Sequence, residues 1–569
     1  MSFLKIARLL LLFATAAAVT QAEAQMPAPT LPGASVDTTY NAPVGGKTWQ
    51  PHNGADLKNA LSSAQPGDLI VLDAGATYEG NFELPAKDNP NHKWIYLISS
   101  ELSRLPGPGT RVNPATDAAN MAKIATTNVT AAVKILPGAS NYRLVGLEFT
   151  SASTNGCNLQ NVPRVNCFSY NLVYVAGVKG QPLPDSITID RCYLHGSPTQ
   201  DVREGVIANG TNVAVIDSYI SDIHQNVFDS QAILAFLTPG PLKIVNNYLS
   251  ATTENVMIGG AGGSDNPYVP SDIEIRNNYL FKPLEWAQVG ITIPPKNQWA
   301  TKNHLEFKSG RRVLVDGNLL ENNWKSAQMG FSILLTVRTG QSGDVAVVDD
   351  ITITNNILKN VTSGFSTLFS DYSCGTAAYA KCTNPGETKR IKVYNNLVLF
   401  RDPNVIGGAR NTGIQIAANS TDFVFQHNTM VAAPGTDCWN SLFFDVPTGT
   451  KWPPAESMTH NIWILDNVLC RPPTGDFGAQ GAIGLNYYMG DPAPVASRYI
   501  GNVMLAPSGS KIAEFPPGNL LTKAPIQYHL DSTNGKIQLI APEIAKTSDG
   551  KPVGADTGKL NTAVLGGRE

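Results

Sequence analysis

One short motif, which recurs along the chain, constrains the fold more than any other feature. Each copy is an alternating apolar segment that runs into an asparagine and an apolar pair, as in 244–249 (IVNNYL) and 353–358 (ITNNIL). Aligning the copies places one asparagine per repeat in a single column, at steps of roughly 30 to 40 residues, a period typical of solenoids. The column holds Asn247, Asn278, Asn318, Asn356, Asn396, Asn428 and Asn467, and two earlier copies place Cys192 and Ser218 in it.

A column of asparagines at a bend predicts a ladder, in which each side-chain amide bonds to the next coil and to the backbone of the turn. Burying an unpaired amide costs several kcal/mol, so a complete ladder is the stable arrangement. Period-2 segments such as 186–189 (SITI) and 351–353 (ITI) lie between the ladder positions and indicate short strands, apolar inside and polar outside. The sequence therefore predicts an all-β parallel β-helix of about ten coils.

The ends of the chain indicate export and capping. Residues 1–24 carry Lys5 and Arg8, an apolar run from Leu9 to Val19 and a small-residue ending, which together predict a signal peptide. No later stretch approaches the roughly 20 apolar residues that span a bilayer. We therefore expect a secreted protein, periplasmic or extracellular, with an N-terminal cap and first coils at 25–140, a β-helix body at 141–505 and a C-terminal cap or tail at 506–569.

Cysteine spacing favours disulfides, as expected of an exported chain. The expected pairs are Cys157 with Cys167, Cys374 with Cys382, and Cys438 with Cys470. Cys192 is left over, and its place in the ladder column predicts a small buried residue.

Charge excludes one class of partner. The chain has 42 Lys and Arg against 45 Asp and Glu, a formal net charge of -3. A nucleic-acid partner would require a clustered basic surface, which the sequence does not show. A polysaccharide partner remains open.

The segment from Asn53 to Leu61, with 64–72 (AQPGDLIVL) and 75–78 (GATY), resembles the N-terminal capping segment of the pectate-lyase-like right-handed β-helix superfamily. More narrowly, 229–233, 243–249, Glu254-Asn255 and 270–276 resemble a group of secreted bacterial β-helix repeat proteins. The resemblance implies a right-handed solenoid and leaves lyases, glycoside hydrolases, pectin esterases and spike proteins open.

A group of polar residues follows the ladder position in five successive coils and predicts a groove. Arg203 and Asp229 both lie eleven residues beyond their ladder position, so we expect them one coil apart; Glu254, Glu285 and Lys325 share an offset of seven. The predicted catalytic residues are Arg203, His224 and Lys282. The predicted substrate-binding residues are His195, Gln231, Asn255, Trp286, Trp299 and Trp324, the tryptophans through stacking on sugar rings, and the predicted calcium ligands are Asp229, Glu254 and Glu285.

This patch favours a lyase that cleaves an acidic glycan such as pectate or alginate by β-elimination. In that reaction Arg203, His224 or Lys282 would act as the base. The arginine-centred motifs of pectate lyases and most motifs of polygalacturonases are missing, although Arg390-Ile391-Lys392 is present. A glycoside hydrolase and a non-catalytic carbohydrate-binding or surface solenoid therefore stay open.

Overall fold

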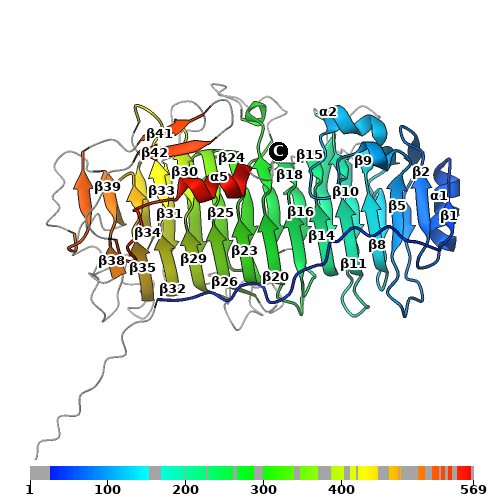
Figure 1. The fold of residues 1–569 in the computed structure, drawn as a ribbon, viewed down its shortest axis with the longest axis horizontal. Helices are drawn as coiled ribbons and strands as arrows, with labels where there is room; N and C mark the ends of the chain where they lie inside the picture. Colours follow the sequence, from blue (N-terminus) through cyan, green and yellow to red (C-terminus); the bar gives the residue numbers. More distant parts are fainter. Residues whose placement is uncertain are drawn as a thin grey trace, which may run out of the picture.

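The computed structural model describes residues 26–152, 168–198, 200–225, 228–260, 266–287, 299–338, 346–368, 386–402, 411–417, 421–436, 438–445, 460–472, 474–475, 498–505, 515–523, 527–531, 536–540 and 547–565. Three long sheets, in which every strand pair is parallel, run the length of this part of the chain (Figure 1). Successive strands visit the three sheets in turn, as β14, β15 and β16 do. The predicted parallel β-helix is therefore confirmed.

Sheet A precedes the ladder turn in each coil. Its strands are β1 (Thr48–Trp49), β2 (Leu69–Leu72), β5 (Ile95–Ser99), β8 (Ser140–Val145), β11 (Asp185–Asp190), β14 (Thr211–Ile216), β17 (Leu242–Val245), β20 (Ser271–Arg276), β23 (Gly310–Asp316), β26 (Val347–Thr354), β29 (Glu387–Tyr394), β32 (Thr421–Gln426), β35 (His460–Leu465) and β38 (Tyr499–Ile500).

Sheet B follows the ladder turn. Its strands are β3 (Thr77–Glu79), β6 (Ala122–Thr126), β9 (Leu147–Ser151), β12 (Tyr193–His195), β15 (Tyr219–Ile223), β18 (Tyr248–Ala251), β21 (Tyr279–Phe281), β24 (Leu319–Asn323), β27 (Ile357–Val361), β30 (Leu397–Phe400), β33 (Thr429–Val431), β36 (Val468–Leu469), β39 (Val503–Leu505) and β40 (Leu520–Thr522).

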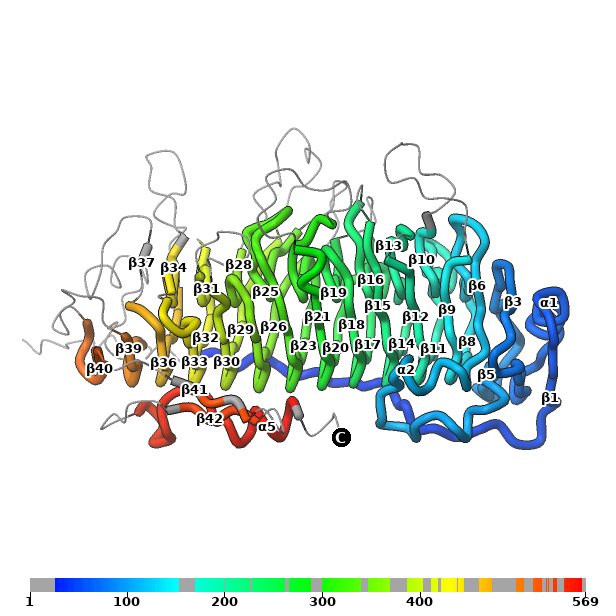
Figure 2. Tube along the Cα trace, turned by 90° about the horizontal axis from the view of Figure 1, so that it is seen from above, coloured from blue at the N-terminus to red at the C-terminus, as the bar shows by residue number. Residues whose placement is uncertain are grey.

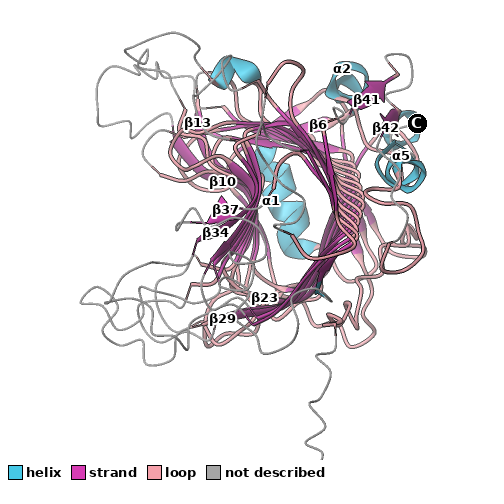
Figure 3. Ribbon diagram, turned by 90° about the vertical axis from the view of Figure 1, so that its left-hand side faces the viewer, coloured by secondary structure: helices cyan, strands magenta, loops and turns pink. Residues whose placement is uncertain are grey.

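Sheet C closes the coil. Its strands are β4 (Phe82–Leu84), β7 (Val133–Ile135), β10 (Phe168–Val175), β13 (Asp201–Ala208), β16 (Gln231–Ala235), β19 (Glu254–Ile258), β22 (Leu305–Phe307), β25 (Phe331–Thr336), β28 (Ser363–Leu368), β31 (Thr412–Ala417), β34 (Asn440–Asp445) and β37 (Thr474–Gly475). Figure 3 shows the three sheets end-on around a shared interior.

Like residues stack from coil to coil inside the solenoid. In sheet A, Ile244 pairs with Ile275, Ile275 with Val315 and Val315 with Ile353, and all four side chains are fully buried. One coil cannot bury its own apolar face, so this continuous column of side chains is what holds the coils together.

The asparagine ladder is confirmed. The amide nitrogen and backbone N–H of Asn318 both donate to Oδ1 of Asn356, each at 2.9 Å, and the same pair of bonds links every ladder asparagine from Asn247 onward. The ladder continues beyond the predicted column to Asn502 and Asn519. At the other end the backbone N–H of Cys192 donates to Ser218 Oγ, and burial raises the pKa of this free thiol to about 12.

The residue before each ladder position adopts a left-handed backbone. Asn246, Asn355 and Asn395 have φ between 54° and 58°, and the corresponding positions 317 and 501 are glycines. Asparagine and glycine tolerate this region best, which explains why the motif reads Asn-Asn or Gly-Asn.

The N-terminal end is closed by a helix. Helix α1 (Gly54–Ser63) is N-capped by Asn53 Oδ1 and buries Leu57 and Leu61 against the first coil. Residues 26–47 do not cap the end but run along sheet A, from Thr30, bonded to Asp350 of β26, to Thr39, whose carbonyl accepts from Arg143 of β8 (Figure 1). The short helices are η1 (Leu102–Arg104), α2 (Pro114–Asp117), η2 (Ala118–Asn120) and η3 (Leu284–Trp286).

The C-terminal segment covers an apolar stripe on the outside of sheet B. The antiparallel pair β41 (Gln527–Leu530) and β42 (Ile537–Ile540) and helix α5 (Thr557–Leu565) lie along this face (Figure 2). Leu560 and Val564 of α5 pack on Leu397, Val431 and other side chains of sheet B. His427 Nε2 lies 3.2 Å from Asp549 Oδ2, and the backbone N–H of Ser548 donates to Asp466 Oδ1 at 2.7 Å, so the segment is fastened to two successive coils.

The disulfide between Cys438 and Cys470 is present as predicted. The four cysteines of the other two predicted pairs, and residues 1–24 with the expected signal peptide, lie outside the described residues. Within the described part of the chain, none of the helices has the length and apolar character needed to cross a membrane.

Candidate active site on sheet C

A charged cluster lies on the outside of sheet C, where strands β13, β16 and β19 begin. Glu204, Gln231 and Glu254 occupy matching positions in these strands and stack in register. They are almost fully buried, with 2%, 1% and 0% of their surface exposed. Gln231 Nε2 donates to Glu254 Oε2 at 2.6 Å, while Gln231 Oε1 and Glu254 Oε1 accept no hydrogen bond.

Three charged groups with more exposure lie over this buried row. Arg203 Nε lies 2.9 Å from Glu204 Oε1 and donates to the Asp229 carbonyl at 3.2 Å. Lys302 Nζ lies 2.5 Å from Asp229 Oδ2 and 3.7 Å from Glu254 Oε1. The predicted proximity of Arg203 and Asp229 is therefore confirmed. Arg203, Asp229 and Lys302 form one connected group above two buried carboxylates.

Burial controls the protonation of this cluster. It raises the pKa of Glu204 to about 8, since the Arg203 charge offsets only part of the desolvation. Burial opposes protonation of Lys302, but Glu254 and Asp229 outweigh it and raise the pKa of the ammonium. The site thus holds a protonated acid and a firmly charged ammonium near neutral pH.

Strand β22 adds a further pair beside the cluster. Leu305 and Phe307 point into the core, so the alternation of the strand turns Glu306 outward, with Lys308 beyond it. Lys308 Nζ lies 3.9 Å from Glu306 Oε1, and burial raises the pKa of Glu306.

Lys282, a predicted catalytic residue, lies inside the solenoid. Its ammonium is fully buried and donates to the carbonyls of Ala251, Thr252 and Thr253 at 2.8–3.1 Å. Burial lowers the pKa of this group to about 7. The three carbonyls occupy all the N–H donors of an ammonium, so Lys282 closes a turn of the coil.

His224 and the three predicted sugar-stacking tryptophans pack against one another. The His224 ring stacks on Trp299 at 3.8 Å and meets Trp286 edge-on at 6.0 Å. Trp286, Trp299 and Trp324 form one buried cluster, each with 8% or less of its surface exposed. Burial lowers the pKa of His224 to about 4. These rings face protein and not solvent, because large aromatic side chains gain most from mutual burial.

The other predicted residues separate from the cluster. His195 belongs to sheet B, where Nε2 lies 2.9 Å from Glu148 Oε1 and the ring stacks on Tyr193. Asn255 is fully buried and donates to the carbonyls of Leu249 and Phe281. Glu285 lies in η3, where its charge adds to the burial that raises the pKa of Asp222.

The expectation that Glu254, Glu285 and Lys325 share one column is wrong. Val256 pairs with Leu305, so the next sheet C strand after β19 is β22, which follows the long insertion that contains Glu285. A constant offset holds only while the turn between sheets B and C keeps its length, and it already slips by one residue between the coils of Arg203 and Asp229, because Glu204 pairs with Gln231.

The predicted calcium ligands do not converge. Asp229 and Glu254 both face the Lys302 ammonium, which takes the position between them, and Glu285 lies near Asp222. Calcium requires six to eight oxygen ligands around one point. This arrangement does not fit a calcium ion among the three predicted carboxylates.

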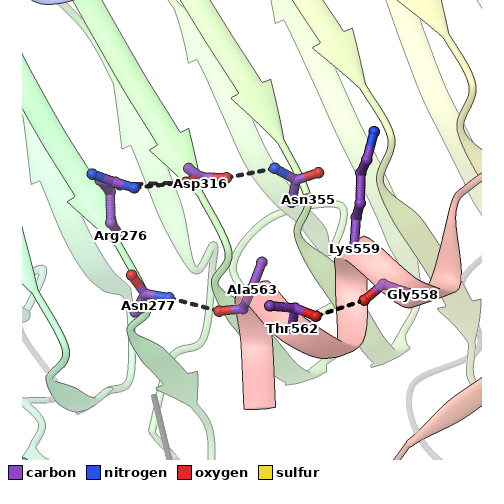
Figure 4. A pocket seen from close by; sticks show the side chains of 8 residues that line it. All are labelled: Arg276, Asn277, Asp316, Asn355, Gly558, Lys559, Thr562 and Ala563. Carbon is purple, nitrogen blue, oxygen red and sulfur yellow. Dashed lines mark hydrogen bonds and ion pairs between the residues drawn. The ribbon is translucent and has the colours of Figure 1, made fainter. Parts of the chain in front are cut away.

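Polar side chains also gather at two other places on the solenoid. A pocket of about 390 Å³ lies between α5 and sheet A, lined by Arg276, Asn277, Asp316, Asn355, Gly558, Lys559, Thr562 and Ala563 (Figure 4). Its Arg276 pairs with Asp316, and Asn277 Nδ2 bonds the Ala563 carbonyl, so its polar groups mainly hold the helix in place. The side chains of His427, Asp466 and Asp549 lie close enough together to hold a metal ion. However, the hydroxyl and backbone N–H of Ser548 both donate to the Asp466 carboxylate, so its oxygens already have partners.

Lys302, Glu306 and Lys308 were missed from the sequence. Lys302 ends an insertion whose position relative to the coils depends on three-dimensional register. The segment 305–308 (LEFK) does carry a signal, since its alternation places Glu306 and Lys308 outside.

Comparisons with known proteins concern the fold. No protein-family profile matches the chain, and no curated protein does. Among solved structures, the chain is similar to the PL6 family alginate lyase AlyGC, with 13% identity, a TM-score of 0.47, and 90% of this chain covering 57% of that one. It is also similar to a polygalacturonase from Erwinia carotovora ssp. carotovora, with 12% identity, a TM-score of 0.41 and coverage of 72% and 95%. A third structure, the surface adhesin PfbA of Streptococcus pneumoniae, has 12% identity, a TM-score of 0.44 and coverage of 75% and 90%.

This chain thus spans 57% of the length of the alginate lyase. Sheets, ladder and cap together define the class: a parallel β-helix with a charged cluster on the outside of sheet C.

Proposed function

We propose that this β-helix acts on a polysaccharide, and that it cleaves an acidic glycan by β-elimination on the outer face of sheet C. The observation that carries the proposal is the layering of charge: Arg203, Asp229 and Lys302 are the accessible groups, while Glu204 and Glu254 lie buried beneath the two cations. Asp229 and Arg203 have 40% and 33% of their side chains exposed and Lys302 has 16%, so an acidic sugar would reach a carboxylate, a guanidinium and an ammonium side by side.

The three accessible groups match the requirements of the reaction. β-Elimination needs a cation against the uronate carboxylate, a base for the C5 proton and an acid for the leaving oxygen. We assign Arg203 to the carboxylate, the Asp229 carboxylate to the C5 proton and the Lys302 ammonium to the leaving oxygen. The C5–H electrons form the C4–C5 double bond as the C4–O bond breaks, and Lys302 protonates the departing oxygen.

The proposal keeps Arg203 from the predicted catalytic set and replaces His224 and Lys282 with surface groups. Gln231 supports the site by holding Glu254. We also propose that the chemistry needs no calcium, since the Lys302 ammonium already lies between the carboxylates predicted to bind it.

A second candidate, glycoside hydrolysis, is favoured by Glu204. A carboxyl whose pKa is raised to about 8 stays protonated at neutral pH and can act as a general acid, with Asp229 as the second carboxyl group of the pair. In that case activity should fall as the pH rises through about 8, because Glu204 then loses its proton.

We further propose that the protein is exported. The apolar N-terminal run supports this, and the Cys438–Cys470 disulfide is compatible with an oxidising compartment.

The test is to incubate the purified protein with uronate and neutral polysaccharides and to follow two products. β-Elimination yields an unsaturated uronate that absorbs in the ultraviolet, whereas hydrolysis yields new reducing ends without that absorbance. We expect ultraviolet-absorbing product from a uronate polymer only, unchanged by a chelator. Reducing ends alone would favour the hydrolase, and binding without either product would favour a carbohydrate-binding solenoid.

A further inference from the structure

We propose that the site on sheet C continues as a glycan-binding lane toward the C-terminal end, and that Trp439 is a sugar platform about four coils from Lys302. This inference rests on the proposed function and extends it to the length of the substrate: a polymer that contacts Lys302 and Trp439 together.

Exposed apolar side chains are concentrated along this edge of sheet C. Among the described residues, nine large apolar side chains are exposed, and four of them lie in or just before strands of sheet C: Tyr170, Phe228, Met329 and Trp439, at 45–61% exposure. Single exposed apolar residues are common, but a row along one sheet edge indicates a binding surface.

Register places the charged and aromatic groups in one column. Ser169 pairs with Val202 and Asn171 with Glu204, so Tyr170 stands beside Arg203. Following the strand pairing from β22 through β25, β28 and β31 to β34 aligns Lys302 with Trp439. Trp439 directly precedes Asn440, which pairs with Thr412 of β31.

The spacing fits a polymer. Four strand steps separate β22 from β34, or about 19 Å, and eight steps separate Tyr170 from Trp439, or about 38 Å. A disaccharide cannot bridge such distances, whereas an extended glycan lying across the strands can.

The Trp439 backbone is held from three sides. Its N–H donates to the Asn411 carbonyl at 2.8 Å, and the preceding Cys438 is fixed by the disulfide to Cys470. Arg471 Nη1 lies 3.5 Å from the Trp439 carbonyl. An exposed indole on a rigid backbone loses little conformational entropy when it binds, a property of aromatic binding anchors.

Phe228 gives the charged end of the lane a similar surface. Its ring is 52% exposed, and the Arg203 guanidinium lies 5.3 Å from the ring centre. An acidic sugar could thus place its ring against Phe228 and its carboxylate against Arg203, while a later sugar stacks on Trp439.

The test compares Trp439→Ala with wild type on a uronate polymer and on short oligosaccharides cut from it. We expect a KM for the polymer raised several-fold to about tenfold, with kcat unchanged, since stacking contributes on the order of 1 kcal/mol. Kinetics on the short oligosaccharides should not change. The matched control is Trp463→Ala on the outer face of sheet A, which should alter neither substrate.

The outcomes separate the two proposals. Unchanged polymer kinetics, or an equal effect on long and short substrates, would overturn the lane while leaving the cleavage reaction in place. If wild type cleaves nothing, affinity electrophoresis in the same polymer decides: retardation that Trp439→Ala alone removes supports the lane, and retardation that it leaves intact, or no retardation of wild type, overturns it.

Discussion

Two columns run along this solenoid, the asparagine ladder inside and the edge of sheet C outside, and they differ in how they repeat. The ladder carries the same amide in coil after coil, fully buried and bonded to its neighbours above and below. The edge column changes with each coil: Tyr170, Arg203, Ser230, Thr253 and then Lys302. In a repeat protein, regularity therefore marks what builds the fold, and a local departure from it marks where a ligand can be recognised.

The largest expected effect comes from a change in the charged group at the edge of sheet C, with the ladder left intact. Asp229→Asn keeps the size of the side chain but removes the proposed base, so activity should fall at least about 100-fold, within the range that a general base contributes. The melting temperature should change little, because Asp229 is 40% exposed. Initial rates on the uronate polymer provide the measurement.

Asp316→Asn supplies the control, since Asp316 also pairs with a cation but lies on sheet A. Equal rates for the two variants and wild type would remove Asp229 from the mechanism.

The next effect breaks the ladder alone. Asn356→Leu leaves the N–H groups of Asn318 without their acceptor and removes the side-chain bond to Asn396, which should cost about 3 kcal/mol or more. Activity per folded molecule should persist. Denaturant unfolding measures the loss.

Asn519→Ala sharpens this expectation, because Asn519 ends the ladder and is only half-buried. It should cost clearly less than Asn356→Leu. Equal costs would show that the ladder does not act as a continuous stack.

The smallest effect concerns the C-terminal segment, which neither column contains. Burial opposes ionisation of Asp549, but Lys551 and His427 outweigh it and lower its pKa to about 2. A carboxyl with a depressed folded-state pKa stabilises docking above its unfolded pKa of about 3.9 and loses this effect as the pH falls toward 2.

Limited proteolysis of the C-terminal segment should therefore accelerate between about pH 4 and pH 2 in the wild type. Asp549→Asn should show faster cleavage already at neutral pH and a flatter pH profile. A pH profile identical to that of wild type would contradict the role of Asp549.

The same contrast explains what the sequence could predict. The ladder was visible because one residue type repeats at one structural position, and Cys192 followed from its place in that column. Arg203 and Asp229 do lie close together as their shared offset predicted, but strand pairing shifts the register by one residue and places Arg203 opposite Ser230. Lys302 could not be placed, since the insertion before it breaks the count, and only strand pairing fixes its position.

Burial was the other property that the sequence could not supply. His224, Lys282 and the three tryptophans are chemically suited to bind a sugar, yet each finds its partners inside the protein. The sequence of a turn does not show whether its polar and aromatic side chains point inward or outward. It therefore could not distinguish these buried side chains from the exposed Arg203.

The most direct test of the account compares Lys302→Met with Lys359→Met in the formation of unsaturated uronate product. Both lysines pair with a glutamate or aspartate at the surface, but Lys359 lies on sheet B, opposite Glu321. If the edge of sheet C carries the chemistry, Lys302→Met loses activity by two orders of magnitude or more, in the range found for removal of one electrostatic group, while Lys359→Met matches wild type. Equal rates for the two variants would contradict the account.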